Sequence, residues 1–355
     1  AFDQLGSLRA TKKQQVERYF TQIQDQLKTF SESTMVVDAM RDFHRTFPLN
    51  PSESTYTNAQ LRRYSAKVDQ YYLNEFSQEF NNQVGTLPDV DKLVPRTAES
   101  IVSQYAYIAN NTHPLGEKSN LDKSSQGRAY DRLHEKYHPV IRNYLEKFGY
   151  YDIFLIEPDT GYIVYSVFKE LDYGTSLIDG PYSDTNFARV FQAAKESQQN
   201  EVVFSEDFEP YLPSYNAAAS FMASPIMENG KLTGVLVFQM PVDRINGIMQ
   251  NSVGLGESGE TYLVGTDLLM RSQSRFTDEP TLLKTKINTA GAKEAVAGQT
   301  GSAIFDDYRG VSVLSTYSPV EIEGLDWAIL AEIDEDEALS AKATLALVGV
   351  VLALL

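Results

Sequence analysis

The sequence predicts an α+β fold in which a long N-terminal helix carries two tandem lobes, each built on an antiparallel sheet. Three observations predict it. Apolar residues recur at helical spacing over residues 5–47, β-rich runs divided by turn signals begin near residue 150, and the order of those runs repeats in a smaller form after residue 260. A chain of 355 residues is long enough to bury a core in each lobe.

The N-terminal third has a helical pattern. Residues 5–47 contain no proline, and helical spacings separate a set of apolar residues: Leu8, Val16, Tyr19, Phe20, Ile23, Leu27 and Phe30. We therefore expect one helix over 5–47, whose apolar stripe either pairs with a second copy in a homodimer or packs on the lobes. Further helical patterns cover 57–82, 96–109 and 128–148.

The first β block begins at residue 150. Runs at 150–158 and 161–170 flank the sequence Pro158-Asp159-Thr160-Gly161, which is a hairpin signal. A helix with a Ser/Asp start follows at 183–197. Three strands complete the block, at 201–208, 216–227 and 231–241.

The second block repeats this order. It has two strands in 260–273, a helix at 287–298, a hairpin at 301–320 and a closing strand at 325–334. We expect Trp327, on that closing strand, to pack against the strand at 311–317. The chain is thereby divided into four parts: a helical region 1–127, a first lobe 128–250, a second lobe 251–338 and a C-terminal segment 339–355.

The C-terminal segment has the composition of a membrane helix. Residues 341–355, AKATLALVGVVLALL, are strongly apolar but fall short of the ~20 residues that cross a bilayer. We interpret them as the start of a transmembrane helix, with a buried C-terminal helix as the alternative. The acidic residues 334–337 before them are typical of the non-cytoplasmic side of a membrane.

Composition excludes several function classes. A net charge of −17 argues against nucleic acid as a partner, because nucleic acid needs clustered basic charge. The chain has no cysteine, which excludes disulfides, zinc–thiolate sites and thiol catalysis, and which favours a bacterial envelope over a secreted eukaryotic module. No cofactor is expected.

Four segments of this sequence resemble the double Cache (PDC) sensor family of bacterial chemoreceptors, sensor kinases and membrane cyclases. They are residues 148–177, 219–241, 256–276 and 308–334, of which the last two carry the most specific motifs, GESGETYLV and GLDW. The resemblance covers nearly the whole chain. It implies two PAS-like lobes, a small-molecule ligand in the membrane-distal first lobe, and a transmembrane helix after the second lobe.

Tyrosines and charged residues of the first β block are the candidate ligand-binding residues. Tyrosine rings and hydroxyls often line small-molecule pockets, although tyrosines also pack sheets routinely. Strand alternation puts Tyr165 and Lys169 on one face, and a loop over 206–216 is expected at the pocket edge. The candidate set is Tyr165, Lys169, Asp172, Tyr182, Asp207, Tyr211 and Tyr215.

Two short motifs point to other chemistry. His134-Glu135-Lys136-Tyr137-His138 matches the H-E-x-x-H pattern of zinc peptidases, but Pro139 follows it directly and no metzincin continuation is present, so a surface helix beside the pocket is the other interpretation. Residues 254–259, GLGESG, match a dinucleotide loop, but a helix precedes them and a strand follows, which is the reverse of the required order.

Together these observations favour a sensor and not an enzyme. We expect a homodimeric domain that faces the periplasm from the bacterial inner membrane, binds a small solute and passes a conformational signal across the membrane. A chemoreceptor is the first expectation, and a histidine kinase or a diguanylate or adenylate cyclase is the alternative output. A membrane-anchored zinc peptidase and a structural envelope protein are the rival classes.

Overall fold

The computed structural model describes residues 2–49, 56–197 and 203–339. The chain divides into two compact units, which we call the first-repeat unit (residues 24–241) and the second-repeat unit (residues 1–23 with 242–355). In the described part of the chain, no helix is both long enough and apolar enough to span a bilayer. We expect the transmembrane helix within residues 341–355. These residues lie outside the part of the chain that the structure describes.

Two helices, and not one, form the N-terminal segment. Helix α1 (Phe2–Ser31) ends before α2 (Thr34–Thr46) begins. The Ser33 side chain caps α2 by accepting a hydrogen bond from the backbone N–H of Val36 (3.3 Å), and a serine cap starts a new helix. The single helix expected over 5–47 is therefore wrong at this break.

Most of the apolar stripe of α1 is buried within the single chain. Val16, Phe20, Ile23, Leu27 and Phe30 are buried, as is Leu5, while Leu8 and Tyr19 are half-buried. The structure therefore favours the alternative that the stripe packs on the lobes over a homodimer seam.

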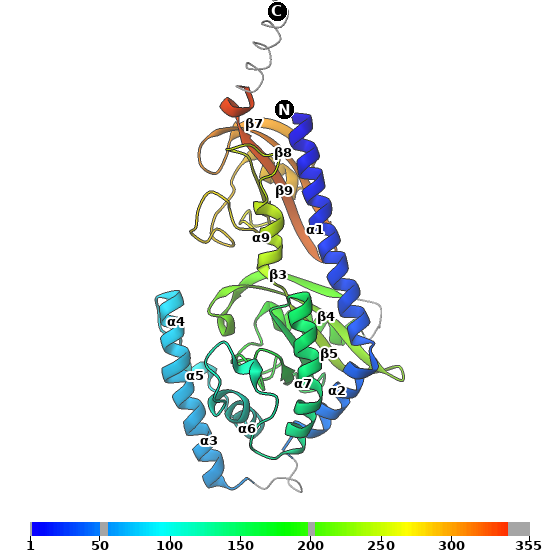
Figure 1. Cartoon of the computed structure of the whole chain (residues 1–355), viewed down its shortest axis with the longest axis vertical. Helices are drawn as coiled ribbons and strands as arrows, with labels where there is room; N and C mark the ends of the chain where they lie inside the picture. The colour runs from blue at the N-terminus through cyan, green and yellow to red at the C-terminus, as the bar shows by residue number, and fades with distance from the viewer. Residues whose placement is uncertain (1, 50–55, 198–202, 340–355) are drawn as a thin grey trace, which may run out of the picture. The chain divides into compact units, whose positions relative to one another are not determined.

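Helices also fill the region between α2 and the first sheet. They are α3 (Asn58–Tyr71), α4 (Ser77–Val84), α5 (Val90–Leu93), α6 (Ala98–Gln104) and α7 (Ala129–Phe148). A π-helical turn, η1 (Tyr72–Phe76), joins α3 to α4, a second one, η2 (Tyr105–Ala109), follows α6, and a short 3₁₀ turn is η3 (Lys118–Asn120). Figure 1 shows α3 and α4 at one edge of the first-repeat unit. Such π turns are rare and are frequent at functional sites.

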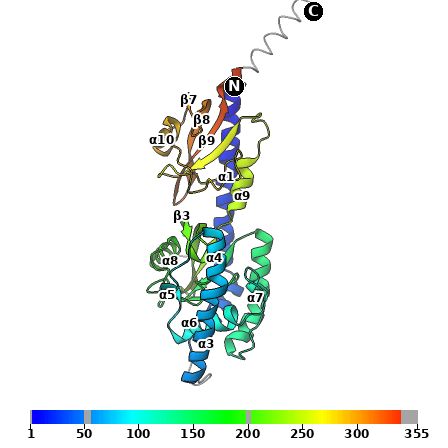
Figure 2. The same ribbon diagram turned by 90° about the vertical axis from the view of Figure 1, so that its left-hand side faces the viewer.

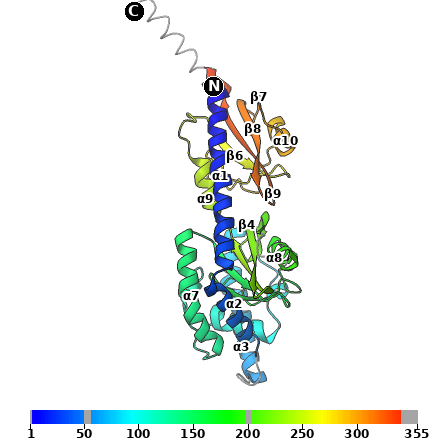
Figure 3. The same cartoon turned by 90° about the vertical axis from the view of Figure 1, so that its right-hand side faces the viewer.

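The first-repeat unit has a five-stranded antiparallel sheet in the order β2-β1-β5-β4-β3. The strands are β1 (Asp152–Ile156), β2 (Ile163–Ser166), β3 (Phe204–Tyr211), β4 (Ala217–Glu228) and β5 (Lys231–Gln239). Helix α8 (Asn186–Ser197) covers one face, and α7 lies on the other side of the sheet (Figures 2 and 3). Strand β3 runs to Tyr211, so most of the loop expected over 206–216 is strand.

Side-chain alternation explains the two faces. Phe154 of β1 contacts Phe187 of α8, with ring centroids 4.6 Å apart. Phe238 of β5 points the other way and contacts Phe30 of α1 (6.2 Å) and Tyr144 of α7 (6.1 Å). Successive residues of a strand point to opposite faces, so helices can cover this sheet on both sides.

The second-repeat unit has a four-stranded antiparallel sheet in the order β6-β9-β8-β7. Its elements are α9 (Val242–Gln250), β6 (Glu260–Val264), α10 (Ala290–Val296), β7 (Gly301–Asp306), β8 (Ser312–Ile322) and β9 (Leu325–Asp334). The second strand expected within 260–273 is reduced to isolated bridges such as Val264 with Met270. The ring of Trp327 packs on Phe20 of α1, and on the neighbouring strand β8 Trp327 lies opposite Val320, just beyond the 311–317 stretch expected to face it.

Candidate ligand-binding site

Asp152, at the start of β1, organises the turn that follows β2. Its buried carboxylate accepts hydrogen bonds from three backbone N–H groups, those of Ile153, Val167 and Phe168. It also accepts one from the Ser166 hydroxyl (2.8 Å), which in turn accepts one from the backbone N–H of Lys169 (2.9 Å). Lys169 has a φ of 63°, in the left-handed region that few non-glycine residues adopt. This strained turn directs residues 169–172 into the unit.

The ammonium group of Lys169 lies in a cage of tyrosine rings. Its Nζ is 4.6 Å from the ring centre of Tyr165, 5.1 Å from that of Tyr173 and 5.8 Å from that of Tyr107. Nζ donates a hydrogen bond to the carbonyl of Ser166. Burial lowers the pKa of Lys169. Cation–π contacts compensate part of the lost hydration of a buried ammonium group.

Two further carboxylates follow Lys169 in the chain. Glu170 accepts hydrogen bonds from the hydroxyls of Tyr151 and Ser214, both at 2.8 Å, and Asp172 Oδ2 accepts one from Tyr211 (2.7 Å). Burial raises the pKa of Asp172 to about 7. Burial also raises the pKa of Glu170, and the neighbouring charge of Asp172 raises it further. Carboxylates this close resist simultaneous ionisation.

Three buried polar atoms beside these carboxylates lack a hydrogen-bond partner among the described residues. They are Asp172 Oδ1, the Tyr182 hydroxyl and Gln239 Oε1. Asp172 is fully buried, and Tyr182 and Gln239 are each 2% exposed. Gln239 joins the group through Nε2, which donates to Ser214 Oγ (3.2 Å). Buried polar groups are almost always paired, and two of these atoms, Asp172 Oδ1 and Gln239 Oε1, are acceptors that lack a donor.

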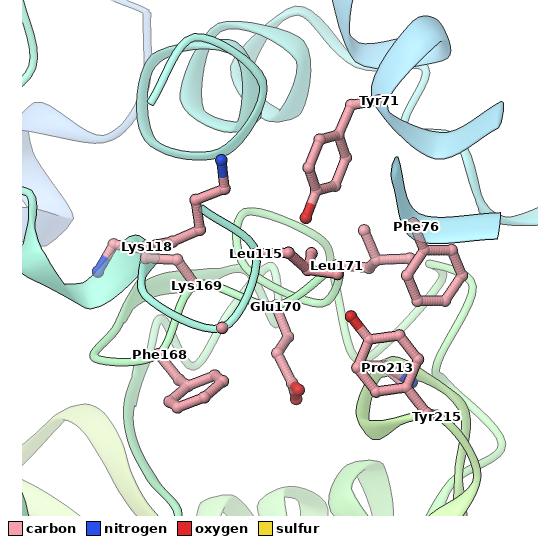
Figure 4. Close-up of a pocket in the computed structure, with 11 residues that line it drawn as sticks. Tyr71, Phe76, Leu115, Lys118, Phe168, Lys169, Glu170, Leu171, Pro213 and Tyr215 are labelled. Carbon is pink, nitrogen blue, oxygen red and sulfur yellow. The ribbon is translucent and has the colours of Figure 1, made fainter. Parts of the chain in front are cut away.

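Glu170 also lines a small hollow with about 30 Å³ of free space. The other lining residues come from α3, η1, the segment 115–118, the turn after β2 and the 3₁₀ turn η4 (Leu212–Ser214) with the residue after it: Tyr71, Phe76, Leu115, Gly116, Lys118, Phe168, Lys169, Leu171, Pro213 and Tyr215. In Figure 4 the hydroxyls of Tyr71 and Tyr215 point into the space between these side chains. Lys118 is 4% exposed and donates a hydrogen bond to the carbonyl of Asn111 (2.9 Å).

A larger hollow, of about 340 Å³, lies beside the β1–β2 hairpin. Its buried carboxylate, Glu157, already accepts hydrogen bonds from the backbone N–H groups of Asp159 (3.1 Å) and Thr160 (2.7 Å), and His44 Nδ1 lies 3.5 Å away. In the second-repeat unit, a further hollow is lined by exposed side chains of α1 and α9, among them Arg18 and Arg244. Among the described residues that line these two hollows, none has a buried side-chain acceptor without a donor, as Asp172 does.

The structure places the candidate residues in four places: two clusters, the hollow, and one position on β3 apart from these. Tyr165 and Lys169 belong to the tyrosine cage, while Asp172, Tyr182 and Tyr211 belong to the carboxylate group, and Tyr215 lines the hollow. Asp207 lies in β3, where its carboxylate accepts from the backbone N–H of Phe208 (2.6 Å). Strand β2 ends at Ser166, so strand alternation does not reach Lys169.

Sequence reasoning missed several members of the site. Glu170 and Gln239 were not among the candidates, although Gln239 ends a clear strand and its side chain lies on the face of Asp152, its cross-strand partner. The helical region contributes Tyr71, Phe76 and Lys118, and nothing in their spacing indicates that they close a pocket on a β lobe.

The H-E-x-x-H motif lies on α7 inside the first-repeat unit. The rings of His134 and His138 stack with centroids 4.4 Å apart and are fully buried, on the inner face of a helix whose outer face exposes Glu135 and Lys136. His138 uses both ring nitrogens, with Tyr165 (2.7 Å) and the carbonyl of Ser119 (2.6 Å). Among the described residues, no group of three or more potential ligands could hold a metal ion. The helix continues through Pro139.

Comparison with known proteins identifies one family. The family described as Cache domain matches residues 3–341 of this chain. Among curated proteins, none matches the chain.

Solved structures with a similar arrangement include two kinds of receptor domain. The ligand-binding domain of the Pseudomonas aeruginosa PAO1 amino acid chemoreceptor PctB, in complex with L-Arg, is 19% identical over 57% of this chain and 80% of its own, with a TM-score of 0.40. The extracellular domain of the putative histidine kinase mmHK1S-Z3 is 12% identical over 81% and 99%, with a TM-score of 0.43. The Pseudomonas fluorescens chemoreceptor CtaA domain in complex with L-isoleucine is 14% identical over 80% and 100%, with a TM-score of 0.37.

Proposed function

This chain belongs to the Cache domain family, and from that premise we propose that it is the ligand-sensing part of a bacterial transmembrane receptor. The domain faces the periplasm, binds a small solute in the first-repeat unit and is not itself an enzyme. The receptor is a chemoreceptor, with a histidine kinase or a diguanylate or adenylate cyclase as the alternative output. If it works as a homodimer, the interface uses surfaces other than the buried stripe of α1.

The single observation that carries the ligand proposal is the unpartnered Oδ1 atom of Asp172. An ionised carboxylate that is buried without donors is expensive, and two more carboxylates lie near it: Glu170 in the same turn, and Asp152 on β1, which accepts a hydrogen bond from Ser166. A protonated amine has three donors and no acceptor, so it supplies what this group lacks. We therefore infer that the solute carries at least one cationic amine.

The hollow beside Glu170 has about 30 Å³ of free space, so it admits an amine head group and must widen to take the rest of a larger solute. Its walls combine aromatic rings, such as Phe76 and Phe168, with the Glu170 carboxylate. Small-molecule sites commonly pair a mainly apolar lining with a few polar groups that fix orientation. Glu170 belongs to both the hollow and the carboxylate group, so an amine held there could extend toward Asp172.

A thermal-shift screen on the whole chain tests this function. The probes are primary amines and amino acids, each matched with its neutral amide or its deaminated acid. Saturating ligand stabilises a folded protein by RT ln(1 + [L]/Kd), about 2.7 kcal/mol at 100 Kd, so a bound amine should raise the melting temperature measurably. Shifts confined to anionic solutes, or absent with every amine, would contradict the amine proposal.

Asp172→Asn is the matched variant for the screen. The amide keeps the shape of the side chain and can still accept from Tyr211, but it has no negative charge. We expect the variant to fold and to lose the amine-induced shift. An unchanged shift would place the site elsewhere.

A further inference from the structure

Two buried glutamates face each other in the second-repeat unit. Glu260 of β6 and Glu332 of β9 are direct partners in the antiparallel register, and they are only 3% and 2% exposed. Like charges directly opposite each other destabilise a sheet, and two close carboxylates in a buried site cannot both ionise readily. One of the pair must therefore hold a proton over part of the pH range.

The two glutamates differ in their hydrogen bonds. Glu260 accepts from donors at both oxygens: the Ser274 hydroxyl and the backbone N–H of Arg275 (3.0 Å) reach Oε1, and the Tyr308 hydroxyl (2.6 Å) reaches Oε2. Both oxygens of Glu260 therefore have donors without a proton of its own.

Glu332 is bonded differently. Its Oε2 accepts from the Tyr262 hydroxyl (2.8 Å), while its Oε1 has no partner among the described residues. The next strand places Ser315 directly opposite Glu332, and the Ser315 hydroxyl, which is fully buried, also lacks a partner there. A serine hydroxyl can both donate and accept, so it can donate to an ionised Oε1 and can accept from a protonated one, and this pair accommodates either state of Glu332.

The first-repeat unit shows what a neutral side chain does at the same position. There the acidic first residue of the strand, Asp152, is paired in register with Gln239, whose amide is uncharged at every pH. The two sheets share the strand order β1-β5-β4-β3 and β6-β9-β8-β7, so Gln239 and Glu332 occupy equivalent positions. A protonated glutamate has nearly the shape and polarity of glutamine.

We propose that Glu332 is a proton-binding site, held between Glu260 and Ser315, through which the second-repeat unit responds to pH. Burial raises the pKa of Glu332 to about 7, against smaller lowering contributions from the Tyr262 and Ser315 hydroxyls. The other titratable groups around it are Asp307 and Tyr308 after β7, while Glu294 of α10 is engaged by Tyr317.

The position of Glu332 gives the proton a structural consequence. Glu332 lies two residues before the end of β9, where Asp334 donates its backbone N–H to Ser258 (3.1 Å) and its carboxylate binds Arg309 (2.6 Å). Loss of the proton places a second negative charge opposite Glu260 inside the sheet. The pairing of β6 with β9 is then weaker. We expect the end of β9, which Ser258 and Arg309 hold through Asp334, to shift in response.

Carbon-13 NMR of the whole chain labelled in glutamate carboxyls tests the proposal between pH 5 and 8.5. We expect high-titrating glutamate signals from Glu332 and from Glu170, whose pKa is also raised by burial; Glu332→Gln should remove one of them and Glu170→Gln the other. The mirror variant Gln239→Glu should add a further such signal. If no glutamate titrates above pH 6, or if Glu332→Gln removes none of the high signals, the proposal is wrong.

Glu260→Gln decides the matter independently if Glu332→Gln does not fold. Removal of the Glu260 charge should lower the titration midpoint of the Glu332 signal by at least one pH unit. A midpoint that does not move would show that Glu260 and Glu332 do not share the site, and it would overturn the proposal.

Discussion

Trp327 and Phe20 meet edge to face, with ring centroids 5.4 Å apart and planes at 90°. Trp327 is the single tryptophan of the sequence and is 1% exposed, and Phe20 lies on α1 within the same second-repeat unit. Alternation along β9 explains the contact. Ala328 and Leu330 pack with Tyr262 in the core under α10, so the odd-numbered residues of β9 face α1.

Truncation of Trp327 should destabilise the second-repeat unit by about 3–5 kcal/mol, the usual penalty for Trp→Ala in a core. A double-mutant cycle with Phe20→Ala should return a coupling of about 0.5–1.5 kcal/mol, since aromatic pairs are worth that much beyond their buried area. Urea unfolding followed by circular dichroism measures both values. Phe187→Ala, in the other unit, is the control, and strict additivity between Trp327 and Phe20 would contradict the direct contact.

The same contact should also link the strand to signalling. We expect a conservative Trp327→Phe variant to bind ligand in the first-repeat unit as the wild type does, and to lower receptor output in a reporter assay on the full receptor. Close-packed contacts transmit displacement, so a looser ring on α1 should weaken the response. Unchanged output with unchanged binding would show that the tryptophan is only structural.

The sequence predicts the periodic parts of this fold well and its local interruptions poorly. The β strands and α7 follow from alternation and helical spacing, because each buries one face. The break after Ser31 depends on Ser33, whose capping role cannot be distinguished from a mid-helix serine by spacing alone. The family resemblance is confirmed by the match over residues 3–341.

The candidate site was predictable where its residues belong to the first β block, as Tyr165, Asp172 and Tyr211 do. Tyr165 and Lys169 were found together, but the turn that aims Lys169 at the tyrosine rings depends on a left-handed φ that no spacing rule indicates. Tyr71 lies about a hundred residues before Glu170 in the sequence, and Lys118 about fifty. Only the tertiary fold brings them close to Glu170.

Asp172 should make the stability of the first-repeat unit depend on pH. Burial raises its pKa to about 7, from about 3.9 in an unfolded chain. Its stabilising contribution is therefore complete below pH 4 and is lost as the pH rises through 7. Relative to Asp172→Asn, the wild type should lose stability between pH 4 and 8, by at most about 4 kcal/mol at 1.36 kcal/mol per unit. Parallel unfolding curves for the two proteins at every pH would contradict this.

The affinity for an amine should depend on the same proton. An ammonium group binds the ionised carboxylate, so affinity should rise as the pH increases through 7 and reach a plateau while the amine stays protonated. Isothermal titration calorimetry at pH 5.5 and 8 measures the change. In Tyr211→Phe, which removes the donor to Asp172 (2.7 Å), the pH dependence should move to higher pH, because the ionised form loses a hydrogen bond.

Lys12 should be essential to the packing of α9. Its ammonium group is 6% exposed and donates to three carbonyls at the end of that helix, those of Ile248 (2.7 Å), Met249 (3.0 Å) and Asn251 (2.6 Å). Lys12→Met leaves these acceptors without their donor, and the unfolding free energy should fall by about 1–3 kcal/mol. The neighbouring Lys13, which forms a solvent-accessible ion pair with Glu321, is the control, and Lys13→Met should change stability by less than about 1 kcal/mol.

Lys169 should show opposite effects on stability and on ligand response. Its ammonium group is buried among tyrosine rings, and burial lowers its pKa. The charged form is therefore less stable in the folded protein than in water. Replacement of a buried charge by an apolar side chain of similar size is often neutral or stabilising, so Lys169→Met should unfold at the same or a higher denaturant concentration. Because the residue also lines the hollow, we expect the ligand-induced melting shift to decrease in this variant. Urea unfolding with and without the best amine of the screen measures both effects. A clear loss of stability with a normal shift would mean that Lys169 supports the fold rather than the site.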